Sequence, residues 1–112
     1  MTVKEREEGD VVVLELSGKI MGGPDASLLK QKLDDLLDKG RTKVVADMSK
    51  VKWMNSSGLG ILISGLATMR NKNGNLKLSN VTDKIHSLLM ITKLLTVFDT
   101  FESTEEAIAS FK

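Results

Sequence analysis

The chain has 112 residues, of which 41% are hydrophobic, and 16 basic against 15 acidic side chains leave a formal charge of +1. This length and apolar content predict a single globular domain over residues 1–112 and exclude a disordered chain. The balanced charge argues against direct binding of nucleic acid by phosphate neutralisation, and no apolar run is long enough to span a membrane.

Periodicity and turn residues then predict the elements in chain order. A charged edge strand comes first and pairs as a hairpin, across Gly9–Asp10, with a strand Val11–Leu16 that ends at Ser17–Gly18. A helix Ala26–Lys39 ended by Gly40, a strand Lys43–Met48 and a helix that starts near residues 55–58 and is closed by Asn73–Gly74 follow. The remaining elements are a strand Asn75–Ser79, a helix Val81–Met90, a strand Val97–Phe101 and a final helix that opens with Ser103–Glu106.

The order of these elements predicts the fold class. In Asn75–Ser79, two leucines alternate with Lys77 and Ser79, which predicts that one face of the sheet is exposed to water there. Strands separated by helices, joined by right-handed crossovers, build a parallel sheet. We therefore expect an α/β domain with a mixed, mostly parallel sheet of four to five strands and about four helices, largely on one face.

Residues 52–63, KWMNSSGLGILI, place Asn55, Ser56 and Ser57 where a strand turns into a helix. One such side chain is enough to cap a helix N-terminus, yet three follow one another. Gly58 and Gly60 are also unusual, since glycine in the first helical turn costs up to about 1 kcal/mol relative to alanine. They indicate either close packing of helix on sheet or a bare surface that a partner approaches. Spacing alone favours neither.

Catalytic patterns are weak in this sequence. SSGLG does not have the spacing of a nucleophile elbow, and His86, the one histidine, lies in a predicted helix with no acid paired to it. The glycines lack the third member of a dinucleotide fingerprint and no phosphate-loop lysine follows. No loop gathers carboxylates at metal-ligand spacing. We therefore expect no enzymatic activity, no cofactor and no metal site.

The location of the protein is predicted from what the sequence lacks. The charged start MTVKEREEGD has no apolar core of a secretory signal. Cysteine is absent, so neither a disulfide framework nor a thiolate site is expected. A cytoplasmic protein is the resulting expectation.

The segment DMSKVKWMNSSGLGILI, from Asp47 to Ile63, resembles the signature of STAS domains, specifically that of the bacterial anti-sigma factor antagonists. LSGKI at residues 16–20 is similar to the end of the second strand in that family. LLTVFDTFESTEEAIASF at residues 94–111 is similar to its last strand and helix. The resemblance thus covers nearly the whole chain and implies the STAS fold.

What the resemblance implies for function is a binding switch. Ser56 would be phosphorylated by an anti-sigma factor that is itself a serine kinase, and a serine phosphatase would remove the phosphate. The unphosphorylated protein would bind the anti-sigma factor and free a sigma factor for transcription. The implied contact surface around Ser56 comprises Asn55, Ser57, Gly58, Leu59, Gly60 and Met21.

Two positions depart from the family pattern. Asn55 stands where the family usually carries Asp before the first serine, and Met21 stands in the region of a second acid. An alternative interpretation is therefore a STAS scaffold or sensor-complex module that uses the same surface without phosphorylation. A third, a small enzyme with Ser56 or Ser57 as nucleophile, ranks below both.

Overall fold

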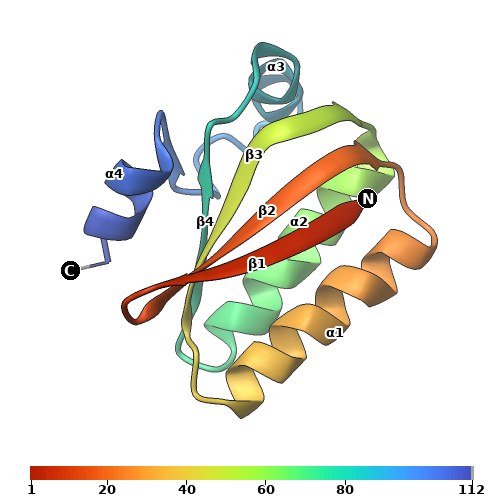
Figure 1. Cartoon of the computed structure of the whole chain (residues 1–112). Coiled ribbons are helices and arrows are strands. Elements are labelled where there is room, and N and C mark those ends of the chain that lie inside the picture. The colour runs from red at the N-terminus through yellow and green to blue at the C-terminus, as the bar shows by residue number, and fades with distance from the viewer. Residues whose placement is uncertain (112) are drawn as a thin grey trace.

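The computed structural model describes residues 1–111 and shows one five-stranded mixed sheet in the order β1-β2-β3-β4-β5 (Figure 1). β1 and β2 pair antiparallel and every other neighbouring pair is parallel, so the predicted α/β fold is confirmed. The elements are β1 (Thr2–Glu8), β2 (Val11–Ile20), α1 (Pro24–Asp38), β3 (Lys43–Met54), α2 (Ser56–Arg70), β4 (Asn75–Ser79), α3 (Asp83–Ile91), β5 (Thr100–Phe101) and α4 (Thr104–Ala109).

The two central strands are longer than predicted. Ser17 and Gly18 do not end β2, which continues to Ile20 through shifts in its register against β3. Such irregular pairing lets Gly18 take a positive φ of 84° inside a strand, a conformation otherwise typical of a turn. β3 runs to Met54, so the connector predicted after Met48 is strand as well. The end of β3 therefore lies directly before Asn55.

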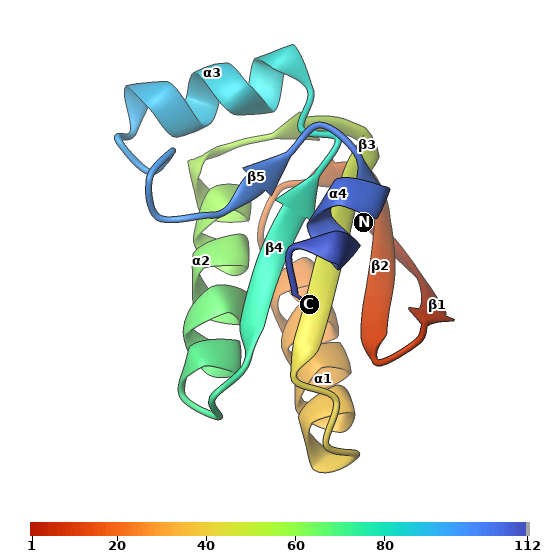
Figure 2. The ribbon, with the colours of Figure 1, turned by 90° about the vertical axis from the view of Figure 1, so that its left-hand side faces the viewer.

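The main core lies between the sheet and three helices. α1 and α2 run side by side across one face, and α3 lies over the end of the sheet at which β3 finishes (Figures 1 and 2). The apolar stripe of α1 supplies Leu29, Leu33 and Leu36, which are all buried. The stripe of α2 supplies Leu59, Leu62 and Leu66. Burial of these apolar side chains against the sheet is the main stabilising contribution.

On the opposite face of the sheet, α4 covers β3 and β4, so the prediction of a wet face at β4 is wrong (Figure 2). Lys77 is only 8% exposed: its ammonium group donates to Ser110 Oγ at 2.7 Å and lies 4.2 Å from the centre of the Phe111 ring. Ser79 is fully buried, and its hydroxyl group is 2.8 Å from that of Thr104. Polar side chains can line a buried face when each finds such a partner.

Two further boundaries differ from the sequence prediction. The last strand is confined to Thr100–Phe101 rather than starting at Val97, because the residues before it form a turn in which the Val97 N–H donates to the Leu94 carbonyl oxygen at 3.0 Å. α3 begins at Asp83, with the Thr82 side chain as its N-cap. Ser103 caps α4 as predicted, since its hydroxyl group accepts from the Glu106 backbone N–H at 3.1 Å. Within residues 1–111, every helix is too short or too polar to cross a bilayer.

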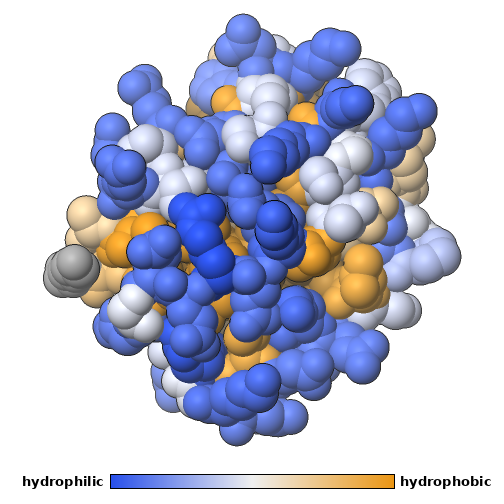
Figure 3. All heavy atoms as spheres, in the orientation of Figure 1, coloured by the Kyte–Doolittle hydropathy of each residue, from blue (hydrophilic) through white to orange (hydrophobic). Residues whose placement is uncertain are grey.

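On the face shown in Figure 3, polar and charged side chains dominate and apolar atoms form small separate patches. Exposed ion pairs such as Arg41–Glu7 at 2.8 Å and Lys32–Glu5 at 3.0 Å lie on the molecular surface. Exposed pairs of this kind contribute about 1 kcal/mol or less each. The charged side chains of both signs therefore lie on the solvated surface of the domain.

Candidate functional site

The corner between β3 and α2 is held by one side chain, that of Asn55. Its Oδ1 atom accepts a hydrogen bond from the Gly58 backbone N–H at 2.8 Å, which makes Asn55 the N-cap of α2. Its Nδ2 group donates to the Met21 carbonyl oxygen at 3.4 Å, which links the corner to the turn between β2 and α1. The capping role left open among three residues therefore belongs to Asn55.

Ser56 and Ser57 are both exposed in the first turn of α2. Neither hydroxyl group has a hydrogen-bond partner among residues 1–111. No acidic side chain lies in that turn to offset the positive end of the helix dipole. The two hydroxyl groups are thus accessible to a reagent or partner and are not required for capping.

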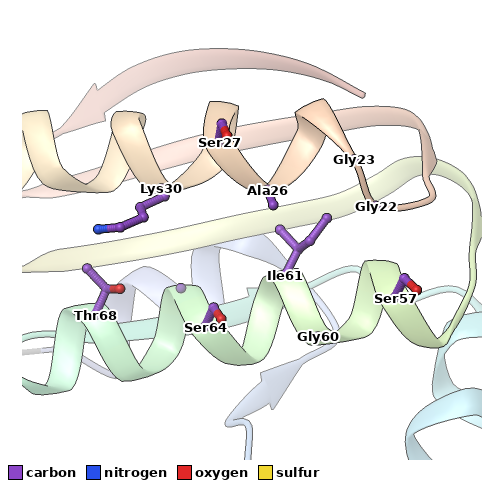
Figure 4. Close-up of a pocket in the computed structure, with 11 residues that line it drawn as sticks. Gly22, Gly23, Ala26, Ser27, Lys30, Ser57, Gly60, Ile61, Ser64 and Thr68 are labelled. Carbon is purple, nitrogen blue, oxygen red and sulfur yellow. The ribbon is translucent and has the colours of Figure 1, made fainter.

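The two serines differ in their surroundings. Ser57 lines a hollow of about 400 Å³ between α1 and α2, together with Gly22 and Gly60 (Figure 4), whereas Ser56 does not line it. A Cβ atom placed on Gly22 would lie 3.2 Å from the Ser57 Cβ atom, so the turn after β2 approaches Ser57 closely. The Ser56 hydroxyl group is the less confined of the two.

The two glycines of the corner serve different purposes. A Cβ atom on Gly58 would lie 1.9 Å from the Ile20 carbonyl oxygen and 2.8 Å from the Met54 side chain, so this position requires glycine for close packing. A Cβ atom on Gly60 would meet nothing within 4 Å. Close packing thus explains Gly58, and a bare exposed surface describes Gly60.

The predicted contact surface is corrected at two of its residues. Leu59 is 2% exposed and belongs to the main core, and Gly58 is buried against β2, so neither offers a side chain to a partner. Both residues stay part of the corner because they fix the position of α2. By contrast Met21, at 45% exposure, can be touched from outside.

Sequence reasoning missed one carboxylate at the corner. Asp25 lies in the first turn of α1, and its Oδ2 atom accepts a hydrogen bond from the Met21 backbone N–H at 3.5 Å. The available signal was topological: β2 and β3 are parallel neighbours, so the turn after β2 must lie beside the turn after β3. Asp25 is thus a carboxylate beside Met21, and its Oδ1 atom also pairs with the Met1 ammonium group at 3.3 Å.

Comparison with protein families gives the assignment. The family model described as STAS domain matches residues 2–107. The chain belongs to the STAS domain family.

Relatives of this STAS domain carry regulatory names. The anti-sigma-B factor antagonist of Bacillus subtilis is 28% identical over 101 residues, which cover 90% of each chain. A crystal structure of an anti-sigma factor antagonist from Mycobacterium paratuberculosis has a TM-score of 0.81 at 21% identity, covering 97% of this chain and 92% of that one. The Bacillus protein SpoIIAA in its phosphorylated form has a TM-score of 0.75 at 18% identity, covering 99% and 100%. The structural likenesses show a shared fold.

His86 of this STAS domain is not joined to the serines. It lies on α3 and lines a separate hollow with Asp83 and Glu102. Within the part of the chain that the structure describes, its side chain makes no hydrogen bond to Ser56 or Ser57. A serine nucleophile needs a base within hydrogen-bond reach, so the geometry gives no support to the interpretation as a serine enzyme.

Asp47, which opens the family signature, has a structural role. Burial raises the pKa of this carboxyl group, but hydrogen bonds from the Ser49 backbone N–H, the Asn80 amide and the Ser49 hydroxyl group, with the charge of Arg6, outweigh burial and hold the pKa below its ordinary value. The Ser49 N–H and Asn80 Nδ2 atoms lie 3.0 and 3.1 Å from Oδ1. The ionised carboxylate therefore joins β3 to the end of β4.

This lowered pKa predicts acid sensitivity of the fold. Because the folded state binds the Asp47 proton less readily than the unfolded state, the stabilisation is complete above about pH 4 and is lost as pH falls through the lowered pKa. An Asp47→Asn variant should lose about 1–2 kcal/mol at neutral pH and show a smaller loss on acidification. Urea denaturation of both proteins from pH 7 to pH 2 measures this, and equal pH dependence would contradict it.

The cap of α2 predicts a second change in stability. Asn55→Ala removes the acceptor of the Gly58 N–H and should lower the free energy of unfolding by about 1 kcal/mol. Asn55→Asp is the matched control, because it keeps a capping oxygen and introduces the acid usual in the family. In urea denaturation, the free energy of unfolding of Asn55→Asp should equal or exceed that of the wild type. A decrease as large as that of Asn55→Ala would refute the capping role.

Proposed function

We propose that this protein is an anti-sigma factor antagonist that binds an anti-sigma factor serine kinase and is switched off by phosphorylation of Ser56. The observation that carries the proposal is the exposed Ser56 hydroxyl group, free of capping because Asn55 caps α2. A residue with no part in the fold can be modified without cost to the fold. By binding the anti-sigma factor, the unphosphorylated form would free a sigma factor and so control transcription.

The relatives support the antagonist role. Anti-sigma-B factor antagonist is the name of the Bacillus subtilis relative, which spans 90% of this chain. SpoIIAA, which shares the fold, has a structure in the phosphorylated form. We extend both properties to this chain as a proposal: the kinase adds the phosphate, and a serine phosphatase in the same cytoplasm removes it.

The contact surface that we propose consists of the exposed parts of the corner. Asn55 and Ser57 flank Ser56 in the chain, the exposed Met21 is joined to Asn55 through its carbonyl oxygen, and Gly60 adds a patch without a side chain one turn into α2. Gly58 and Leu59 are buried and contribute by fixing the position of α2 through packing. A partner lying on this surface would cover the Ser56 hydroxyl group.

Intact mass spectrometry tests the proposal. The protein is incubated with the serine kinase-type anti-sigma factor of the same organism and MgATP, beside Ser56→Ala and Ser57→Ala variants. We expect one added phosphate on the wild type and on Ser57→Ala, and none on Ser56→Ala. Because both hydroxyl groups lack partners in residues 1–111, neither variant should be destabilised, and Ser57→Ala controls for loss of a neighbouring hydroxyl.

One observation favours a second candidate, an unswitched STAS scaffold or sensor-complex module. The residue before Ser56 is the neutral Asn55 where the family usually has an acid. If the kinase binds this protein but transfers no phosphate to it, the scaffold role replaces the switch. Phosphate found on Ser57 alone would instead refute the choice of Ser56.

A further inference from the structure

Several large apolar side chains are exposed on the surface of the domain. In residues 1–111 these are Met21, Leu28, Trp53, Met90 and Ile91. Three of the five lie at the end of β3 or on α3, the helix that projects beyond the sheet in Figure 2. Ile91 is 79% exposed, which is unusual for a large aliphatic side chain on a helix. Exposed apolar surface of this kind marks interaction sites.

The patch is concave. Trp53 and Ile91 border a groove of about 160 Å³ whose remaining apolar lining comes from Met54, Ile85 and Leu88. Met54 and Ile85 are 5% and 2% exposed, so the base of the groove is continuous with the main core. A groove of this size fits one large apolar side chain. A membrane surface would instead require apolar side chains that protrude into it.

The rim of the groove is positively charged. Among the residues that line it, Lys84 is the charged one, and Lys52 directly precedes Trp53 in a chain whose net charge is only +1. The Lys84 ammonium group lies 5.9 Å from the centre of the Trp53 ring. Lys50 pairs with Glu15 at 3.5 Å, but Lys52 and Lys84 have no ion-pair partner in the described chain. Asp83, at the start of α3, is the one acid on that helix.

We propose that this groove is a second part of the docking surface and takes an apolar side chain of the anti-sigma factor that is flanked by carboxylates. The inference rests on the proposed function. Its basis is charge complementarity: carboxylates on the partner would pair with Lys52 and Lys84, which lack partners here. Only Met54 and Asn55 separate Trp53 from Ser56 in the chain, so a partner in the groove lies beside the phosphorylation site.

This arrangement gives the phosphate a physical means of action. The partner's carboxylates that pair with these lysines would also lie close to the phosphate on Ser56, which carries about −1.5 to −2 charges. Like charges brought together at an interface suppress binding. The groove thus supplies affinity for the unmodified form, and its acidic occupant makes the complex sensitive to the phosphate.

The test is a titration of the kinase used above with unphosphorylated wild type, Ile91→Ser, Lys84→Glu and Leu28→Ser. Ile91 and Lys84 are exposed, so their variants should fold, and thermal unfolding verifies this. Leu28 is the matched control, an exposed leucine on α1 outside the groove. We expect Kd to rise at least about thirtyfold for Ile91→Ser and tenfold for Lys84→Glu, and to stay within about twofold for Leu28→Ser.

The outcomes separate this inference from the proposed function. If the kinase phosphorylates Ser56 but both groove variants bind like the wild type, the groove proposal is overturned and the switch stands. If the kinase neither binds nor phosphorylates the wild type, both are overturned. Sedimentation with vesicles containing phosphatidylglycerol adds a third arm. Vesicle binding that Lys84→Glu abolishes, with kinase affinity unchanged, would assign the groove to a membrane instead.

Discussion

A Gly58→Ala variant should lose about 3 kcal/mol or more of its free energy of unfolding, at the upper end of overpacking substitutions. The new methyl group would lie 1.9 Å from the Ile20 carbonyl oxygen, and backbone cannot swing aside as a flexible side chain does. Relief requires α2 to move away from β2, which disturbs the packing of Leu59 in the core. Urea denaturation followed by circular dichroism measures the loss.

Gly60→Ala is the control for this prediction. It adds the same methyl group two residues later in the same helix, where nothing lies within 4 Å. Since alanine favours a helix over glycine by up to about 1 kcal/mol, this variant should be as stable as the wild type or more so. Equal stability of the two variants would show that α2 does not approach β2 as closely as described.

Phosphorylation of Ser56 should weaken binding to the kinase-type anti-sigma factor by at least about 100-fold while the domain stays folded. A buried charge left without a matched partner costs about 3–5 kcal/mol, which corresponds to about two to three and a half orders of magnitude in affinity. The free domain tolerates the same charge, because a phosphate at a helix N-terminus is favourable by about 0.3–1 kcal/mol. Gel filtration should show co-elution with the kinase before modification and separate peaks after it.

The fold of the phosphorylated protein provides the control. Its melting temperature should be equal to or slightly above that of the unmodified protein, and changes in amide chemical shift should stay near the turn after β2 and the start of α2. Shifts extending to α4, which packs on the other face of the sheet, would contradict a block confined to the interface and would indicate a conformational switch.

The fold could be predicted from local patterns wherever one face of an element was apolar. The leucines of α1 and α2, the hairpin at Gly9–Asp10 and the capping by Ser103 all have local signals, and the structure agrees with them. The errors occurred where tertiary contacts override such signals. Lys77 and Ser79 alternate like surface residues, but α4, more than 20 residues later, covers both. Ser17–Gly18 resembles a turn but is a pairing irregularity inside β2.

The candidate site was predictable in position but not in detail. The serine pair and its glycines follow from the sequence and its family resemblance, and they do lie at the start of α2. Which residue caps the helix, and which glycine is obligatory, depends on how closely β2 approaches, as Asn55 and Gly58 show. The exposure of Trp53 was also hidden, because the residues before the corner read as a loop and not as the end of β3.

Calorimetric titration of one kinase preparation with a single protein in three successive states is the most direct test of the role of Ser56. The states are unmodified, phosphorylated on Ser56 alone as verified by fragment mass, and dephosphorylated with a serine phosphatase. We predict that the unmodified protein binds tightly, that the phosphorylated protein has a Kd at least about 100-fold higher, and that dephosphorylation restores the Kd of the unmodified protein. Equal affinity in all three states would contradict the claim that the exposed Ser56 hydroxyl group controls docking.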